Sequence, residues 1–450
     1  MPVTAVVTTH TIATENRWSA EFYDPRYDRP LTKKYAWLPI GMVLDLCQYG
    51  LSKAMNDDQQ GWPMYRMNEI DGVFLDRPER FVELTPKEYS AYRLQYDDVL
   101  FNRTNSFDFV GRTGILKRDV DAVFASYLVR VRPNRSLILP EFLTVYLNTA
   151  FGVGQIRRRA MPSINQTNVS AAELKRIPIP LVPRTEQDPI AALVKQASDL
   201  GAKAHKQYED ARTALETGLG LSAMPPSRSL TFETDLADTC FSRRFDAQHF
   251  RKEFMTLYQV LQAECDTSPL RDLVIFNQRG RQPVYVPEGP VAVVNSQHIG
   301  WQHLRSDELE HTSQVVYDED PRSRLYKDDV IVYATGAYVG RTNVFLEDTP
   351  AVASNHVNIL RVKPGCDPAY IALLLNSKVG AMQTEKYITG STQAELYPGN
   401  LAKFLIPILD GRRQREIGDK VRESYLALKE SRSRIQEAIS EVETLVEQST

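Results

Sequence analysis

At 450 residues the chain is too long for one ordinary hydrophobic core and suits two domains with connecting elements. Its 42% hydrophobic and 25% charged residues are typical of a folded soluble protein, and no apolar run approaches the ~18–20 residues of a membrane helix. The first residues lack the pattern of a secretory leader. The cysteines are too scattered for a zinc site or a disulfide framework, so a cytoplasmic location is expected; they are Cys47, Cys240, Cys265 and Cys366.

Charge is distributed unevenly along the chain. The formal net charge is −3. Residues 1–184 carry 24 Lys and Arg against 20 Asp and Glu, whereas residues 185–450 carry 30 against 37. A DNA-binding face in the second part would therefore have to be a local basic cluster within an acidic domain.

The first part of the chain, residues 1–184, mixes strand-like and helix-like segments. Asp97–Arg103 is a short β-rich run after a charged turn, and Phe124–Val131 runs apolar like a strand. Pro140–Leu147 is typical of a helix that opens with proline and an acidic residue. We therefore expect an α/β or α+β domain here.

A long spacer helix is expected next, in residues 185–220. Between Glu186 and Glu216, apolar or small residues recur at spacings of three and four. They are Leu193, Ala197, Leu200, Ala204, Gln207 or Tyr208, Ala211 and Leu215. The glycines and prolines of Gly218–Ser229 indicate a linker into the second domain.

Residues 221–410 repeat the order of the first part. Asp328–Ala334 and His356–Val362 are strand-like, and Pro368–Leu375 is helix-like. From Ile417 to Leu445 apolar residues alternate at spacings of four and three, which predicts a C-terminal spacer helix in residues 411–450. Two such helices in one chain most simply pair with each other, as an antiparallel coiled coil.

The two parts also resemble each other directly in sequence. Asp97–Leu100 recurs as Asp328–Ile331, 231 positions later, and Val110–Thr113 recurs 229 positions later. Further matches, in the same order, pair Arg17–Ala20 with Arg244–Ala247, Leu128–Pro133 with Ile359–Pro364, Leu147–Thr149 with Leu375–Ser377, and Ile179–Pro180 with Ile406–Pro407. So long a period indicates two whole, internally duplicated domains rather than a solenoid.

The first part carries three motifs in a fixed order, Tyr49–Lys53 (YGLSK), Trp62–Met67 (WPMYRM) and Asp98–Thr104 (DVLFNRT). Together with the duplication, these motifs resemble those of the specificity subunits of type I restriction–modification systems. Ile177–Leu181 followed by Glu186-Gln187 resembles that family's entry into its central helix. The second part is looser: Val330–Thr335 stands in place of the third motif, and Arg413–Glu416 replaces the Glu-Gln entry.

The resemblance implies a non-catalytic chain with two target-recognition domains, each of which reads half of a bipartite site on double-stranded DNA. It implies methyltransferase subunits, two of them by the duplication, as partners in DNA methylation and phage defence, and restriction or translocase subunits beside them. S-adenosylmethionine, ATP and Mg would be bound on those partners. No cofactor and no metal is expected on this chain.

An enzyme would need motifs that the sequence lacks. The Pro-Pro pair, Pro225-Pro226, lies in the expected linker without the flanking residues of a methyltransferase motif, and there is no phosphate-binding G-x-x-x-x-G-K loop. Three alternatives remain. One is an enzyme that fuses recognition to catalysis, another is the recognition chain of a different DNA-modification complex, and the third is a coiled-coil scaffold that does not read DNA.

Candidate DNA contacts in the first domain lie in predicted loops at strand ends. Lysine and arginine can meet phosphate or guanine, and asparagine can pair with adenine. The candidates are Tyr49, Gly50, Ser52, Lys53, Asn102, Arg103, Thr104, Asn105, Ser106, Arg112, Arg157 and Arg158.

In the second domain, Asn277–Gln282 is the segment most typical of DNA contacts, because it offers amides and guanidinium groups around a glycine. Its candidates are Asn277, Gln278, Arg279 and Arg281, and further candidates by position are Thr335, Tyr338, Arg341, Ser391 and Gln393. Gly-Arg recurs at Arg112 and Arg341, which indicates either a phosphate contact or a requirement of the fold.

The spacer helix also predicts a function for its length. About 30 helical residues span about 45 Å, and one turn of B-DNA is about 34–36 Å. We therefore expect the helix to act as a ruler that sets the number of unread bases between two half-sites.

Overall fold

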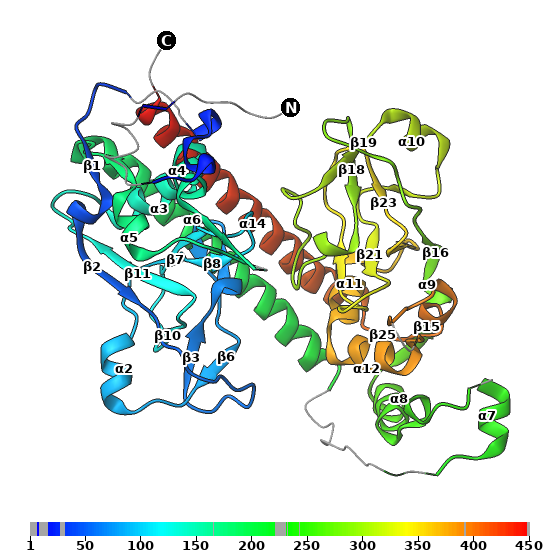
Figure 1. The fold of residues 1–450 in the computed structure, drawn as a ribbon. Coiled ribbons are helices and arrows are strands. Elements are labelled where there is room, and N and C mark those ends of the chain that lie inside the picture. Colours follow the sequence, from blue (N-terminus) through cyan, green and yellow to red (C-terminus); the bar gives the residue numbers. More distant parts are fainter. Residues whose placement is uncertain are drawn as a thin grey trace. The chain divides into compact units, whose positions relative to one another are not determined.

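The computed structural model describes residues 7–8, 17–27, 32–164, 166–220, 231, 233–242, 244–390 and 393–447. These residues form two compact units (Figure 1). Unit 1 comprises residues 1–201 and 429–450, and unit 2 comprises residues 202–428. Both units mix helices and strands, which confirms the predicted fold class. Residues 221–230 of the expected linker lie outside the described part of the chain.

Unit 1 is built around a six-stranded sheet with the strand order β2-β11-β7-β9-β5-β4, beside smaller sheets β10-β3-β6, β12-β13-β8 and β1-β14. Its elements are η1 Ala20–Tyr23, η2 Pro25–Tyr27, β1 Trp37–Pro39, η3 Ile40–Val43, β2 Leu44–Tyr49, β3 Trp62–Tyr65, η4 Met67–Glu69, β4 Ile70–Asp71, β5 Phe74–Leu75, β6 Arg80–Val82, α2 Pro86–Tyr92, β7 Val99–Asn102, β8 Thr104–Asn105, β9 Thr113–Ile115, β10 Val123–Phe124, β11 Leu128–Pro133, α3 Pro140–Asn148, α4 Ala150–Arg159, β12 Met161–Ser163, β13 Gln166–Asn168, α5 Ala171–Arg176 and β14 Pro178–Pro180.

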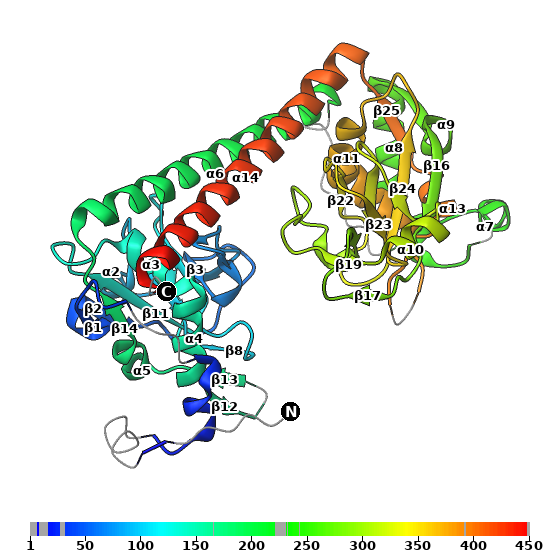
Figure 2. The same cartoon turned by 90° about the horizontal axis from the view of Figure 1, so that it is seen from above.

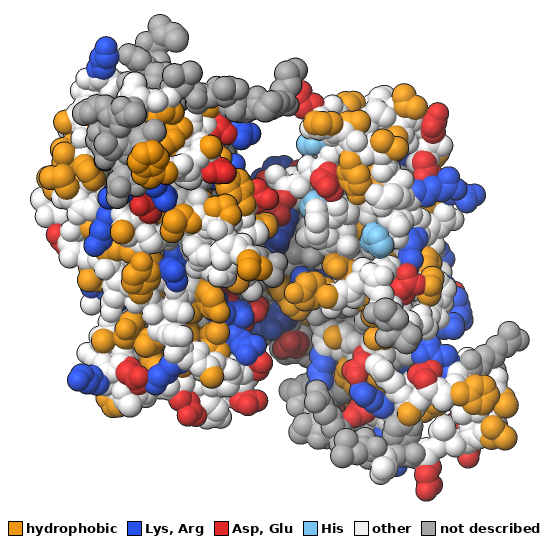
Figure 3. All heavy atoms as spheres, in the orientation of Figure 1, with side chains coloured by type: hydrophobic (Ala, Val, Ile, Leu, Met, Phe, Trp, Pro, Cys, Tyr) orange, Lys and Arg blue, Asp and Glu red, His pale blue; other side chains and the backbone are white. Residues whose placement is uncertain are grey.

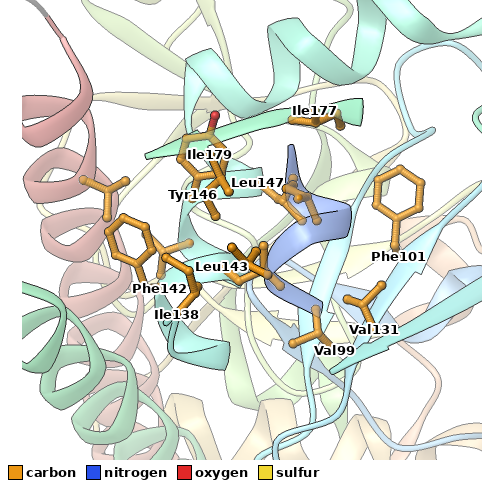
Figure 4. Close-up of a cluster of buried hydrophobic side chains, with 14 of the residues drawn as sticks. Val99, Phe101, Val131, Ile138, Phe142, Leu143, Tyr146, Leu147, Ile177 and Ile179 are labelled. Carbon is orange, nitrogen blue, oxygen red and sulfur yellow. The ribbon is translucent and has the colours of Figure 1, made fainter. Parts of the chain in front are cut away.

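Helix α3 forms the centre of the unit 1 core, as the apolar run from Pro140 predicted. Its Phe142, Leu143 and Tyr146 are fully buried and belong to one hydrophobic cluster with Val99 of β7 and Val131 of β11 (Figure 4). Burial of such side chains removes large apolar areas from water and stabilises the sheet–helix contact. The core therefore fixes one face of the main sheet and leaves the strand ends to carry the loops.

Unit 2 has a four-stranded sheet, β16-β24-β21-β22, and a five-stranded sheet, β17-β19-β18-β23-β20, with a two-stranded sheet β15-β25. Its elements are α7 Leu236–Ser242, η6 Ala247–Phe250, α8 Lys252–Glu264, β15 Asp266–Pro269, α9 Leu270–Leu273, β16 Val274–Arg279, β17 Tyr285–Val286, β18 Val291–Val294, η7 Ser296–His298, β19 Glu310–Thr312, α10 Gln314–Glu319, β20 Arg324–Leu325, β21 Val330–Tyr333, β22 Thr342–Val344, β23 Ala351–Ala353, β24 Val357–Val362, α11 Pro368–Asn376, α12 Lys378–Tyr387, α13 Pro398–Leu401 and β25 Leu405–Ile408.

The duplication is visible in strand order and register. The order β2-β11-β7-β9 in unit 1 corresponds to β16-β24-β21-β22 in unit 2. Asp97 and Asp328, which precede β7 and β21, both have φ of 69°, a left-handed conformation that is uncommon outside glycine. A polar turn before a strand, rather than a pair of catalytic carboxylates, explains the recurring Asp-Asp.

One sequence match is out of register by two residues. The sequence pairs Arg130 with Arg361, but the strand pairing places Val131 opposite Val99 and Leu360 opposite Val330. Arg132 is therefore the equivalent of Arg361. Each of these arginines forms an ion pair with a buried aspartate. Its Nη2 donates a hydrogen bond to that aspartate, over 2.9 Å from Arg132 to Asp98 and 2.7 Å from Arg361 to Asp329. The Arg-x-Arg spacing in β11 allows either alignment of the sequences, and the strand register distinguishes them.

The two long helices are α6, Arg184–Gly218, and α14, Gly411–Val446, which lie side by side (Figures 1 and 2). In unit 1, Ile190 and Val194 of α6 pack with Ala438 and Val442 of α14. In unit 2, α6 packs against the opposite end of α14, through Leu215 near Ile417 and other residues. The helices are thus antiparallel, as predicted.

The seam of α6 differs from the predicted one in its first half. Val194 is buried, whereas Leu193 and Leu200 are half-buried, so the seam passes through Val194 and Gly201. Gly201 has no side chain that a hydrophobic pattern could reveal. On either side of Gly201, hydrogen bonds join the two helices. Ser431 Oγ donates to the Ala197 carbonyl over 2.7 Å within unit 1, and Ser424 Oγ donates to the Ala204 carbonyl over 2.6 Å within unit 2.

A buried glutamine anchors the start of each long helix. Gln187 Nε2 donates to the Val182 carbonyl over 2.7 Å, and its Oε1 accepts from the Leu139 N–H before α3. Gln414 repeats this with the Leu409 carbonyl over 2.7 Å and the Asp367 N–H over 3.1 Å. The glutamine of the Glu-Gln entry is therefore retained in unit 2, although the acidic residue before it is replaced by arginine.

Among the described residues, no helix combines the length and apolarity needed to cross a membrane. The cysteines Cys47, Cys240, Cys265 and Cys366 carry free thiols.

Candidate nucleic-acid interface

A glycine permits a close backbone crossing at the end of the edge strand of the main sheet in each unit, β2 in unit 1 and β16 in unit 2. A Cβ on Gly50, after β2, would lie 2.2 Å from the Ala125 carbonyl oxygen, and one on Gly280, after β16, would lie 2.1 Å from that of Ala353. Only glycine permits this approach. The two loops that the sequence selected as DNA candidates, one in each half, therefore occupy equivalent places in the two units.

Tyr49 and Lys53 flank this crossing in unit 1. Tyr49 is 45% exposed, and its hydroxyl accepts a hydrogen bond from the Ala171 N–H over 2.9 Å. Ser52 and Lys53 are exposed, and Lys53 forms an ion pair with Glu88 at 2.7 Å. Hydrogen bonds from Lys53 and Thr85 lower the pKa of Glu88 to about 2. The lysine charge is thus partly balanced by a neighbouring carboxylate.

The loop after β7 divides into buried supports and exposed residues. Asn102 is fully buried; its Nδ2 donates to the Phe109 carbonyl over 3.1 Å and its Oδ1 accepts from the Thr104 N–H. Thr104 is also buried and donates to Asn168 Oδ1 over 2.7 Å. These two candidates hold the loop and are not available to a base in this conformation.

Three other candidates in that loop remain accessible in whole or part. Arg103 is half-buried, with its guanidinium carbon 5.2 Å from the centre of the Tyr49 ring. Asn105 is half-buried, and its Oδ1 accepts from the N–H of exposed Ser106 over 2.8 Å. Arg103 thus stands between the strand ends of β2 and β7.

The recurring Gly-Arg-Thr is explained mainly by the fold. Gly111 and Gly340 have φ of 89° and 95°, and Thr113 and Thr342 both donate to the carbonyl of that glycine over 2.9 Å. The arginine between them also repeats a contact, because Arg112 stacks on Phe109 at 4.2 Å. Arg341 stacks likewise on Tyr338 and, from its other side, on Trp301, each at 3.6 Å.

The basic run in α4 is tied to its surroundings. Arg157 is half-buried and lies 5.8 Å from the centre of the exposed Phe107 ring. Arg158 donates to the Phe22 carbonyl over 3.0 Å and stacks on the Phe22 ring at 4.4 Å. Of these two candidates, Arg157 is nearer to the exposed loop after β8.

In unit 2 the candidates of β16 separate by face. Asn277 Nδ2 donates to the Pro398 carbonyl over 2.9 Å, which secures the start of α13. Gln278 is exposed. Arg279 forms an ion pair with Glu395 at 3.5 Å and stacks on Tyr397 at 5.0 Å. Arg281 is exposed and lies 3.7 Å from Asp320.

Of the remaining unit 2 candidates, Thr335 contacts this cluster. Thr335 is buried and donates to Glu395 Oε1 over 3.4 Å, so, like Thr104, it supports the loop. Tyr338 and Gln393 are exposed. Tyr338 lines a hollow of about 380 Å³ with Trp301, Arg341 and others. Ser391 lies outside the described residues.

Glu395, Tyr397 and Trp301 were missed by sequence reasoning. A hydrogen bond from Tyr397, with Arg279 and Thr335 beside it, holds the pKa of Glu395 below its usual range, so it is a carboxylate near neutral pH. Glu395 lies at the position of Asn168, since Thr335 bridges Glu395 as Thr104 pairs with Asn168. The duplication could have indicated this position, because the two residues are 227 apart, as are the Ile-Pro pairs.

Charges on the visible faces of the two units are mixed. Figure 3 shows Lys and Arg side chains interspersed with Asp, Glu and hydrophobic side chains. Any nucleic-acid contact on these faces would thus depend on local groups rather than on a broad basic field.

Comparison with known proteins gives a consistent family. Residues 253–439 match the family model described as "Type I restriction modification DNA specificity domain". The chain is 28% identical over 170 residues to the MjaX specificity subunit of Methanocaldococcus jannaschii, a match that covers 37% of this chain and 40% of that protein. It is 27% identical over 173 residues to the type I restriction enzyme EcoKI specificity subunit of Escherichia coli K12, covering 38% and 37%. The chain thus matches about two fifths of the length of these relatives.

Among solved structures, the type I restriction-modification S subunit from M. genitalium is similar with a TM-score of 0.44 and 12% sequence identity, covering 94% of this chain and 99% of that one.

Proposed function

Because this chain carries a type I restriction modification DNA specificity domain at residues 253–439, we propose that it is the DNA-reading subunit of a type I restriction–modification complex. Unit 1 and unit 2 would each read one half of a bipartite site on double-stranded DNA. The observation that carries the proposal is the equivalence of the two candidate loops. They follow Gly50 and Gly280 at the same crossing in both units, and they bear different polar side chains.

Two half-sites of different sequence require different polar side chains, and the equivalent loops after Gly50 and Gly280 carry different ones. Base edges would be read by accessible side chains at these strand ends, such as Lys53 and Arg103 in unit 1 and Gln278 and Arg279 in unit 2. Exposed basic groups that recur in place, such as Arg112, would instead meet phosphates and set the register. Buried Asn102, Thr104 and Thr335 would hold the loops in shape.

We propose that two methyltransferase subunits bind the chain, one on each unit. Trp18 is 84% exposed, and Phe245, 227 positions later, is 79% exposed. Each aromatic follows an arginine that donates to a carbonyl at the C-terminal end of a corresponding helix, α4 or α12: Arg17 to that of Arg159 over 2.9 Å, and Arg244 to that of Ile388, one residue past the helix, over 3.4 Å. A single exposed aromatic is ordinary, but one kept in both units supports a docking contact for two copies of one protein.

The test is the stoichiometry of the copurified complex by native mass spectrometry. Trp18→Ala should reduce the bound methyltransferase subunits from two to one, and the double variant with Phe245→Ala should bind none. Ile275→Ala is the matched control, because Ile275 is 64% exposed and no apolar residue stands at its counterpart, Asp45. Two copies on Trp18→Ala would reject this docking contact.

The chain itself would perform no chemistry, and S-adenosylmethionine, ATP and Mg would be bound by partner subunits. Among the described residues, no cluster of His, Cys, Asp and Glu is arranged to hold a metal ion. Methyl transfer by the highly purified chain alone would contradict a non-catalytic role.

DNA reading is tested by selecting bound duplexes from a randomised pool with the full chain and its copurifying partners, over a salt series. Two enriched segments separated by unread bases are the expected result, with affinity that falls as salt rises. Salt-sensitive binding without any enriched sequence, or no DNA binding, would favour the scaffold alternative.

A further inference from the structure

An arginine lies over an exposed aromatic ring at the same end of the main sheet in each unit, although the two arginines come from different strands. In unit 1, Arg103 follows β7 and lies 5.2 Å from the ring centre of Tyr49, the last residue of β2. In unit 2, Arg279 is itself the last residue of β16 and lies 5.0 Å from the ring centre of Tyr397. The rings are 45% and 47% exposed.

The strand register shows that the two arginines occupy non-equivalent positions in the two units. Tyr49 pairs with Val129 and Arg279 with Asn358, which are equivalent positions of β11 and β24. Arg279 therefore stands where unit 1 has Tyr49.

The position of Arg103 is occupied in unit 2 by Ala334. The Arg103 N–H donates to the Tyr127 carbonyl over 2.9 Å, and the Ala334 N–H donates to the equivalent His356 carbonyl over 2.8 Å. Each unit thus has one guanidinium at this end of its own main sheet. The guanidinium comes from the residue after β7 in unit 1 and from the last residue of β16 in unit 2.

Neither guanidinium is fully used within the protein. Arg103 Nη1 donates a long bond of 3.4 Å to the Ser126 carbonyl, and its buried Nε has no partner among the described residues. Arg279 reaches Glu395 through Nη1 at 3.5 Å, while its Nε and Nη2 are buried without partners in the described chain. Buried hydrogen-bond donors without an acceptor cost free energy. Each guanidinium would therefore be stabilised by rotating away from the aromatic ring toward an acceptor.

Resting on the proposed function, we propose that Arg103 and Arg279 are the guanine-reading residues of the two units, each donating two parallel hydrogen bonds to O6 and N7 of one guanine in its own half-site. The planar guanidinium matches these two acceptors. Stacking on the aromatic ring positions each guanidinium, and no ion pair of close geometry is needed to do so.

The exchange of strands separates this role from a phosphate contact. The DNA backbone has the same geometry in any sequence, so a phosphate-binding arginine can stay in place through a duplication, as Arg112 and Arg341 do. A residue that reads bases is free to change its position or its type when the two half-sites differ. Arg103 and Arg279 have moved, whereas the glycines, threonines and buried aspartates around them have not.

The experiment is selection from a randomised duplex pool with the full chain and its copurifying partners, comparing the wild type with Arg103→Lys and Arg279→Lys. Lysine keeps the charge but loses the fork. Each variant should lose preference for guanine at one position of one half-site, by roughly tenfold or more, and should read the other half-site as the wild type does. That intact half-site also reports that the chain is folded.

Arg271→Lys is the matched control, because Arg271 is exposed at the opposite end of β16 and should change neither half-site. Binding that weakens equally on all sequences would identify phosphate contacts and overturn the proposal, as would an unchanged preference. A wild-type chain that selects no sequence would instead overturn the proposed function on which this inference rests.

Discussion

Unit 1 and unit 2 share the residues that shape their strand-end loops and long helices, and they differ in the polar side chains that these loops carry. The crossing glycines, Gly50 and Gly280, and the helix-entry glutamines, Gln187 and Gln414, have equivalent contacts in both. The polar side chains at the strand ends are different. The comparison teaches that the residues most alike between the units serve the fold, and that those which differ on a shared support are the ones to test for specificity.

The units also differ below the surface. Asp98 forms ion pairs with Arg132 and also with Arg130, whereas among the described residues Asp329 has an ion pair with Arg361 only, because Ile359 occupies the position of Arg130. Arg130 is buried and donates further bonds to the carbonyls of Arg93 and Ala91. Unit 1 has thus built a larger buried charge network around the same aspartate.

The largest expected effect is the loss of that aspartate's charge. Asp98→Asn should cost unit 1 about 3–5 kcal/mol, because it leaves two arginines near one lost carboxylate. Asp329→Asn should cost unit 2 less, roughly 2 kcal/mol, since Arg361 is partly exposed. Hydrogen exchange resolved by peptide measures each unit separately.

Asp348→Asn is the control for these two variants, because Asp348 and its partner Lys327 are both exposed and their ion pair should contribute less than about 1 kcal/mol. Equal costs for Asp98→Asn and Asp329→Asn would show that Arg130 does not depend on Asp98.

A pH effect should distinguish the units next. His298 ends a capped turn, η7, at the position of Glu69 in η4 of unit 1. Burial, together with Arg305, lowers the pKa of His298 to about 4. The unfolded pKa is about 6.5, so the neutral side chain stabilises unit 2 fully above pH 6.5, and this stability is lost as the pH falls from 6.5 toward 4.

At pH 5 the loss should be on the order of 2 kcal/mol for unit 2. His298→Gln should make the stability difference between pH 7 and pH 5 smaller, and His311→Gln, a change at an exposed histidine, should not. The measurement is urea unfolding at the two pH values, followed by hydrogen exchange to assign the unit. The same pH dependence in His298→Gln as in the wild type would assign the effect to another group.

A smaller effect is expected from exchanging the charge at one equivalent position. Glu395→Gln removes a carboxylate beside Arg279, and Asn168→Asp places one near Arg103, while the bonds from Thr335 and Thr104 can remain. The first should strengthen binding to random duplex by about two- to fivefold, and the second should weaken it similarly, both less at high salt. Titrations at two salt concentrations test this, and two changes of the same sign would refute it.

The sequence predicted the duplication, the long antiparallel helices and the fold class because these depend on patterns that repeat over many residues. Pro140–Leu147 and Pro368–Leu375 lie within α3 and α11, which each extend one residue further. Finer assignments depended on single residues. The Arg-x-Arg of β11 fits two registers, and Gly201 adds nothing to a hydrophobic pattern although it lies on the helix seam.

The site was harder to predict than the fold. Residue type suggested Asn102, Thr104 and Thr335, which the structure buries as loop supports. It also suggested Arg103 and Arg279, but not that each lies over an aromatic ring at the same end of the main sheet of its own unit. Glu395 and Tyr397 were missed because they follow the sheet in sequence and reach it only through folding. Propensity describes segments, whereas a site is assembled from side chains far apart in the chain.

We propose that the two duplicated units read two half-sites, and that the lengths of α6 and α14 set the spacing between these half-sites. Inserting one heptad into α6 between Gly201 and Ala202, and one into α14 between Leu428 and Lys429, keeps the seam in phase and lengthens the connection by about 10 Å. A heptad inserted at the exposed turn of Gly72, where nothing lies near the glycine, is the control.

The measurement is the methylated or selected DNA motif of each variant. We expect both half-sites to stay unchanged while the unread stretch between them grows by about three base pairs, and the Gly72 insertion to leave the spacing as it was. An active variant with both helices lengthened and the original spacing, or one that reads a single contiguous site, would contradict this proposal.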